Sequence, residues 1–156
     1  MSAPLPALLY ESAESYFMGR VVIPVVVENL RDALDAHDGK LPPDEVRRVA
    51  IDKALIDTGA STLSLPTSVI RQLGLTKLKS KRVMTSRGPA ETDSYSAVRL
   101  LVQGRDCTVD VVEIPDGVPA LVGQIPLELM DFVVDPVNQR ITGNPEHNGE
   151  WVLELL

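Results

Sequence analysis

Apolar and polar positions alternate in short stretches along most of the chain, which is the pattern of β-strands that bury one face. Residues 20–29 (RVVIPVVVEN) are rich in β-branched side chains and predict a strand, with Pro24 at a sheet edge or a bulge. Further strands are predicted over 46–57, 62–66, 81–115 (two or three strands, with turns at SRGPAE and QGRD), 132–135 and the closing EWVLELL. Residues 120–123 (ALVG) are a short apolar run that ends in glycine.

Helical spacing is rare and short. Residues 66–74 (PTSVIRQLG) predict a helix that begins near Pro66 and ends at Gly74, and residues 124–131 predict a second one. Residues 30–45 are expected to form an excursion, part helix and part loop. Many short strands with two short helices predict a mainly β domain, a barrel or a sandwich.

Length and charge narrow the classes of protein. The 156 residues fit one domain, expected over 18–156, after a flexible N-terminal tail over 1–17. A formal net charge of −7 makes nucleic acid and anionic membranes poor partners, so neither is predicted. The N-terminal residues lack the basic start of a signal peptide and carry two glutamates where a signal peptide would be apolar. The longest apolar run (VVIPVVV) is too short to span a bilayer. We therefore expect a soluble, cytoplasmic protein.

Cys107 is the one cysteine, and it falls in a predicted strand (DCTVDVV). A buried packing role is favoured over a reactive thiol. No Cys/His cluster has the spacing of a zinc site, so the sequence predicts neither a metal nor a cofactor.

The stretch ALIDTGASTLSLP (54–66) carries the candidate chemistry. Asp57 ends an apolar run, and Thr-Gly-Ala-Ser follows it directly. One interpretation is a tight turn between strands, since Asp, Gly and Ser are common turn residues. The other is a catalytic carboxylate held on a rigid loop.

The segment LIDTGAS (55–61) resembles the active-site loop of the aspartic proteases, and ALVG (120–123) resembles their second signature. The order of elements, the length and the single Asp-Thr-Gly resemble the retropepsin-like (retroviral-type) branch, in particular its bacterial and cyanobacterial group, over residues 18–147. The resemblance implies a mainly β acid-protease barrel with one or two short helices and one half-site per subunit. It also implies a homodimer that takes peptide or protein substrates.

Physical chemistry agrees with this resemblance. Metal-free peptide hydrolysis needs one group to activate water and another to protonate the carbonyl, and two adjacent carboxylates that share a proton do both. A chain with one such loop forms the pair only across a two-fold axis. The function expected is an aspartic endopeptidase with one Asp57 from each subunit. The alternative is a non-catalytic module that keeps the fold for dimerisation or peptide binding.

The resemblance also assigns roles to the neighbours of Asp57. Thr58 braces the two loops across the dimer, and the Gly59 N–H reaches the carboxylates. Ala60 supplies no hydroxyl where pepsin-like enzymes often have serine, and Ser61 stands where the viral enzymes often have aspartate.

Two further segments complete the candidate site. Leu121, Val122 and Gly123 are expected to pack beneath the loop as a scaffold. A hairpin over about 81–97, with Arg87, Gly88 and Pro89 at its tip, is the candidate flap, although a plain hairpin without a lid function is nearly as well supported.

Other polar residues are assigned ordinary roles. Asp135 is predicted in a turn, Asp52 and Asp131 as solvated charges, and His37 and His147 as surface residues. Trp151 is predicted in packing or in a subunit contact.

Overall fold

The computed structural model describes residues 3–4, 17 and 20–155. The predicted tail over 1–17 therefore lies outside the described residues, apart from 3–4 and 17. No helix in the described part of the chain is long and apolar enough to cross a membrane. The cytoplasmic location stays a prediction.

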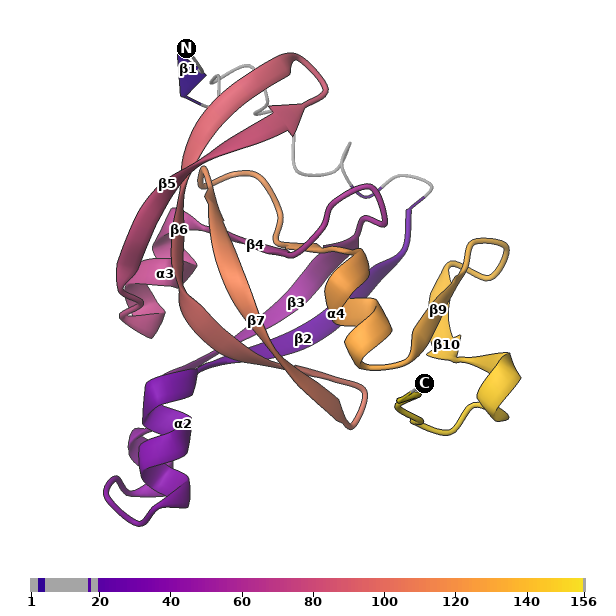
Figure 1. Ribbon diagram of the computed structural model, residues 1–156, viewed down its shortest axis with the longest axis horizontal. Coiled ribbons are helices and arrows are strands. Elements are labelled where there is room, and N and C mark those ends of the chain that lie inside the picture. The colour runs from indigo at the N-terminus through magenta and orange to yellow at the C-terminus, as the bar shows by residue number, and fades with distance from the viewer. Residues whose placement is uncertain (1–2, 5–16, 18–19, 156) are drawn as a thin grey trace.

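A closed β-barrel forms the body of the protein (Figure 1). Its strands are β2 (Val22–Asn29), β3 (Arg48–Ile56), β4 (Leu63–Pro66), β6 (Gly88–Val102), β7 (Arg105–Ile114) and β8 (Leu121–Val122). They pair in the order β6-β2-β3-β8-β4-β7, and pairing between β6 and β7 closes the ring. Outside the ring, β5 (Lys77–Thr85) and β1 (Ala3–Pro4) pair with β6. The predicted mainly β class is confirmed.

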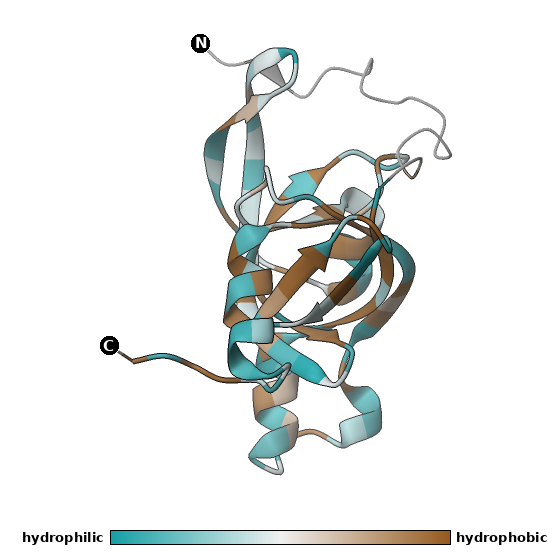
Figure 2. Ribbon diagram, turned by 90° about the vertical axis from the view of Figure 1, so that its right-hand side faces the viewer, coloured by the Kyte–Doolittle hydropathy of each residue, from teal (hydrophilic) through white to brown (hydrophobic). Residues whose placement is uncertain are grey.

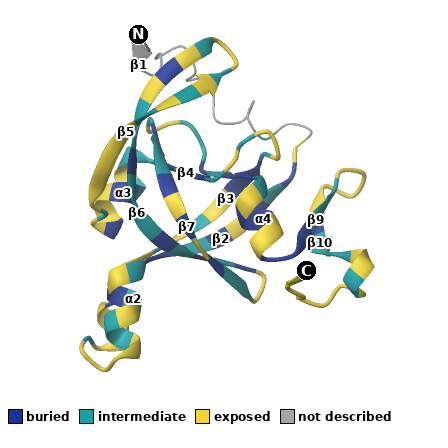
Figure 3. Cartoon of the chain, in the orientation of Figure 1, coloured by how far each residue is buried: buried dark blue, intermediate teal, exposed yellow. Residues whose placement is uncertain are grey.

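The alternation of side chains explains the barrel. Val25 and Val27 on β2 are buried, whereas Pro24 is exposed at a shift in the pairing of β2 with β3, so the predicted bulge is present. The buried apolar residues of the strands form one core cluster. Hydrophobic residues recur along the strands (Figure 2), and many strand positions alternate between buried and less buried residues (Figure 3). Fully buried members of this core include Val27, Leu63, Leu65, Leu73, Val98, Leu100, Val111 and Val122.

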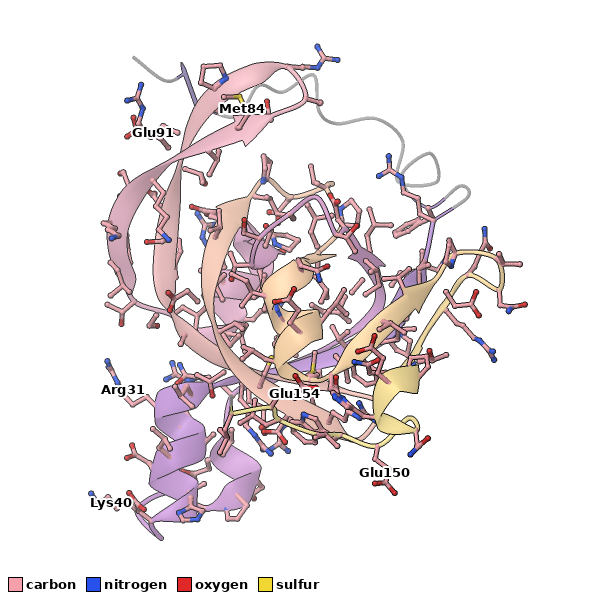
Figure 4. The ribbon with its side chains drawn as sticks, turned by 45° about the vertical axis from the view of Figure 1, so that its right-hand side comes forward. Arg31, Lys40, Met84, Glu91, Glu150 and Glu154 are labelled. Carbon is pink, nitrogen blue, oxygen red and sulfur yellow. The ribbon has the colours of Figure 1, made fainter. Side chains whose placement is uncertain are left out.

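Strands β5 and β6 form a long hairpin that extends beyond the barrel (Figure 1). Thr85 pairs with Gly88, which leaves Ser86 and Arg87 as its two-residue turn. The hairpin predicted over 81–97 is therefore present. Its outer part is largely exposed, and Met84 lies near its far end (Figure 4).

Short helices lie between or after the strands of the barrel in the sequence and pack outside it. Helix α2 (Leu30–His37) and the 3₁₀ helix η2 (Pro43–Glu45) form the excursion predicted over 30–45, which projects from the barrel (Figure 1). The two predicted short helices are α3 (Thr67–Leu73), which ends at Gly74 with φ +62°, and α4 (Gln124–Leu129).

The base of the excursion is tied to the barrel. Asn29 caps α2 by accepting the Asp32 N–H, and its side-chain amide donates to the Leu73 carbonyl at the end of α3. The Arg47 guanidinium lies 2.7 Å from the Asp32 carboxylate, and the hydrogen bond from Arg47 lowers the pKa of Asp32.

The chain ends beside the barrel rather than in it. Strands β9 (Phe132–Asp135) and β10 (Arg140–Gly143) form a hairpin, followed by the 3₁₀ helix η3 (Pro145–His147). The prediction of a last strand in EWVLELL is wrong for the described residues 151–155, which form no ladder. Their polar contacts run instead to α4, to Asp131, which precedes β9, and to His147 of η3.

Candidate active site

Asp57 stands directly after β3, where β8 fixes its backbone. Leu55 and Ile56 pair in parallel with Leu121 and Val122. The Asp57 N–H then donates to the Val122 carbonyl (3.0 Å). Strand β8 lies between β3 and β4, so it holds the strands on both sides of the loop.

The loop over 57–61 turns tightly around the Asp57 carboxylate. The Gly59 N–H donates to Asp57 Oδ1 (3.0 Å), and the Ala60 N–H donates to the Asp57 carbonyl (3.0 Å). A Cβ at position 59 would lie 3.2 Å from Oδ1, so glycine keeps this approach open. Asp57 and Ala60 are half-buried, whereas Thr58, Gly59 and Ser61 are exposed.

Gly123 forms the support beneath the loop. Its N–H donates to the Thr62 carbonyl (2.9 Å), and a Cβ there would lie 2.5 Å from that oxygen and 2.6 Å from the Ala60 carbonyl oxygen. The next two amides, of Gln124 and Ile125, donate to the carbonyls of Ala60 and Ser61 (both 2.9 Å). The 57–61 loop thus rests on β8 and on the first turn of α4.

Thr62 is a support that the sequence reasoning missed. Its hydroxyl donates to the Asp110 carbonyl on β7 (2.9 Å), which ties the end of the loop to the barrel wall. Its place directly after Asp-Thr-Gly-Ala-Ser was the available signal. The strand that accepts the bond could not be identified from the sequence.

The structure brings 57–61 and 121–123 together but keeps the candidate flap apart from them. Among the described residues, no hydrogen bond joins the tip of the hairpin to the loop. The tip is held internally, because Thr85 Oγ1 donates to the Gly88 carbonyl (2.8 Å) and accepts the Arg87 N–H (3.2 Å). Gly88 has φ +112°, and Arg87 and Pro89 on either side of it are exposed.

Several residues lie where the sequence predicts. Asp52 and His37 are exposed, and Asp135 accepts hydrogen bonds from Asn138 in the β9–β10 turn, which lower its pKa. Cys107 is buried in β7, and burial raises the pKa of its thiol to about 11. Within the described residues, no group of His, Cys, Asp or Glu side chains is arranged to hold a metal ion.

The predictions for Asp131 and His147 are wrong. Asp131 is buried, and it accepts hydrogen bonds from the His147 ring, the Val152 N–H and the Asn144 side chain. The His147 side chain is only 15% exposed. The reason is a turn after α4, in which Asp131 adopts φ +57° and directs its carboxylate to a segment 16 residues away.

The comparisons with known proteins define the class of this chain. Residues 46–125, which are 80 of the 156 residues, match the family model described as aspartyl protease. This range contains both the 57–61 loop and β8. The chain belongs to this aspartyl protease family, which confirms the predicted relationship to the aspartic proteases.

Among solved structures, the chain is similar to the solution structure of the simian foamy virus (mac) protease, with a TM-score of 0.39 and 22% identity. That similarity covers 51% of this chain and 81% of the viral one. No curated protein matches the chain.

Proposed function

We propose that this protein is an aspartic endopeptidase that works as a homodimer, with one Asp57 from each subunit in the catalytic pair. The observation that carries the proposal is the Asp57 carboxylate on its braced loop, in a chain of the aspartyl protease family. The sequence has a single Asp-Thr-Gly, so a second carboxylate of this kind must come from a second copy.

The two oxygens of the Asp57 carboxylate have different surroundings. Oδ1 accepts the Gly59 N–H, which fixes the rotation of the side chain. Oδ2 has no hydrogen-bond partner among the residues that the structure describes. Oδ2 is therefore free to bind a water molecule or to share a proton with the other carboxylate.

The chemistry follows from that shared proton. The ionised carboxylate takes a proton from water, whose oxygen attacks the peptide carbonyl carbon, while the protonated carboxyl gives its proton to the carbonyl oxygen. The tetrahedral intermediate then collapses: the C–N bond breaks, the nitrogen leaves with the proton that the first carboxylate took from water, and a hydroxyl of the intermediate returns a proton to the second carboxylate. Activity should follow a bell-shaped pH curve, because the pair works with one proton and fails with two or none.

Exposed apolar side chains next to the loop support association of two copies. Ile125 and Leu129 on α4 are 48% and 42% exposed, and the Ile125 N–H is bonded to the loop itself. Trp151 and Leu153 continue this apolar surface along the C-terminal residues. Surface of this kind often marks an interface between proteins.

The test is cleavage of a mixed peptide pool by the wild type and by Asp57→Asn. The amide keeps the shape of the carboxylate but cannot share its proton, so we expect activity to fall by at least about a hundredfold while the circular dichroism spectrum stays unchanged. Asp52→Asn, at an exposed position of β3, is the matched control and should cut at the wild-type rate. Binding of peptides without cleavage by the wild type would instead support the non-catalytic module.

A further inference from the structure

His147 lies between two carboxylates that come from different parts of the chain. Its Nδ1 is 2.6 Å from Asp131 Oδ2, at the junction of α4 and β9, and its Nε2 is 2.7 Å from Glu154 Oε1 near the C-terminus. The imidazole therefore connects the body of the protein to residues 151–155, which we call the C-terminal segment (Figure 1).

The two short contacts require a charged ring. A neutral imidazole has one N–H, so it donates to only one carboxylate and turns a lone pair toward the other. Only the imidazolium donates to both at once. In agreement, the hydrogen bonds to Glu154 and to Asp131 raise the pKa of His147 above its ordinary value of 6.5.

Few other contacts hold the C-terminal segment. The Trp151 indole N–H donates to the Leu129 carbonyl (3.1 Å), and the Val152 N–H donates to Asp131 Oδ2 (3.1 Å). Leu153 and Leu155 are 70% and 83% exposed and so contribute little burial. Glu154, labelled in Figure 4, depends on its contact with His147.

No neighbouring charged side chain takes the place of His147 between Asp131 and Glu154. Arg105 of β7 donates to the carbonyls of Met130, Asp131 and Gly149 rather than to either carboxylate. On α4, Glu128 accepts the Gln124 amide, and Glu146 and Glu150 on the chain near His147 are exposed. The Asn144 amide donates to the other oxygen of Asp131. Among the described residues, Glu154 forms an ion pair with His147 alone, so no other cation holds it once the His147 ring is neutral.

We propose that His147 is a proton-operated clamp: the charged imidazole holds the C-terminal segment against α4 and β9, and loss of its proton releases Glu154 and then the segment. The proposal goes beyond peptide hydrolysis and does not depend on Asp57.

The direction of the pH dependence follows from linkage. Because the pKa of His147 is raised, its stabilisation is complete below pH 6.5 and is lost as the pH rises through the raised value. Burial of Asp131 opposes its ionisation, but the hydrogen bonds from His147, Val152 and Asn144 outweigh this and lower its pKa below 3.8. The Asp131 contribution is thus present above pH 3.8 and fails only at lower pH.

The only tryptophan of the chain, Trp151, reports directly on the clamp. We would measure quenching of its fluorescence by acrylamide in the full chain, from about pH 5 to about pH 10. Residue Trp151 is 45% exposed in a single clamped chain, so release should raise the quenching constant about twofold as the pH increases, in samples kept dilute enough to be monomeric.

Three variants decide the outcome. His147→Gln keeps a donor for Asp131 but cannot titrate, so quenching should be high and independent of pH. Glu154→Gln should move the transition to lower pH, because it removes the carboxylate that does most to raise the pKa of His147. His37→Gln alters the other histidine, whose side chain is 86% exposed, and should leave the transition in place. A wild-type chain with no transition, or one that persists unchanged in His147→Gln with the same circular dichroism, would overturn the proposal.

Discussion

The direction of the Asp57 carboxylate depends on two glycines from distant parts of the sequence. The Gly59 amide donates to Oδ1, and Gly123 leaves room for the carbonyls of Ala60 and Thr62. A Cβ would lie 3.2 Å from the carboxylate at position 59 and 2.5 Å from a carbonyl oxygen at position 123, so both positions favour glycine.

Gly123→Ala should disturb the site by steric contact alone. The backbone of Gly123 is extended (φ −87°, ψ −173°), so alanine meets no conformational penalty, but its Cβ would overlap the Thr62 and Ala60 carbonyl oxygens. We expect a loss of about 1–3 kcal/mol in the free energy of unfolding, as for other overpacked sites, and a fall in kcat/KM.

Urea unfolding and peptide kinetics measure the two effects. Gly39→Ala is the contrast, since its Cβ would meet open space at φ +75° in the excursion. It should cost some stability and no activity. Gly123→Ala with wild-type stability and kinetics would mean that the loop does not depend on this close packing.

Single residues were predictable where their signal is local. Asp57, Gly59 and Gly123 lie in short motifs whose chemistry is visible in the sequence. Asp131 and His147 were assigned wrongly, because their contact depends on a left-handed turn at Asp131 and spans 16 residues. The hydrophobic and polar pattern of the sequence does not predict a contact between these two residues.

Among the elements, the β5–β6 hairpin has the clearest independent role. Its two-residue turn places Gly88 at φ +112°, which other residues rarely adopt, and its outer part is exposed. We propose that it acts as a flap over bound peptide; the alternative is a plain hairpin without a lid function.

Gly88→Ala should strain the tip of the hairpin at a cost of about 1–3 kcal/mol, and the tip should rearrange rather than the barrel. We expect faster hydrogen exchange of amides around 83–90, unchanged exchange in β2 and β3, and a higher KM. Ser86→Ala, in the same turn, is the control and should behave as the wild type. A hairpin that loosens while the kinetics stay the same would show that it is not a flap.

Elements were predictable where alternation reflects burial. The bulge at Pro24, the end of α3 at Gly74 and the turns of the long hairpins all follow from residue chemistry. EWVLELL has the same apolar content as a strand, yet residues 151–155 bond to the Leu129 carbonyl and to side chains. The sequence pattern does not distinguish a strand from an extended segment held by such contacts.

At the scale of the whole molecule, the proposed function requires each barrel to present one half of a catalytic pair. The exposed loop residues Thr58 and Ser61 and the apolar side chains of α4 lie at the same part of the surface. A second copy placed across a two-fold axis would cover them and supply the second carboxylate.

Activity should therefore depend on protein concentration. We expect sedimentation to show a dimer wherever peptides are cut, and the specific activity to fall on dilution as the dimer dissociates. Full specific activity in a sample that sediments only as a monomer would rule out the shared site.

The most direct test of the shared pair is to mix subunits. Wild-type protein is equilibrated with a threefold excess of Asp57→Asn, and peptide cleavage is measured at a fixed amount of wild type. If a site needs Asp57 from both copies and the subunits pair at random, mixed dimers are inactive, and activity should fall to about a quarter of the unmixed value. Activity that stays at the unmixed value, in a mixture shown to exchange subunits, would contradict the account.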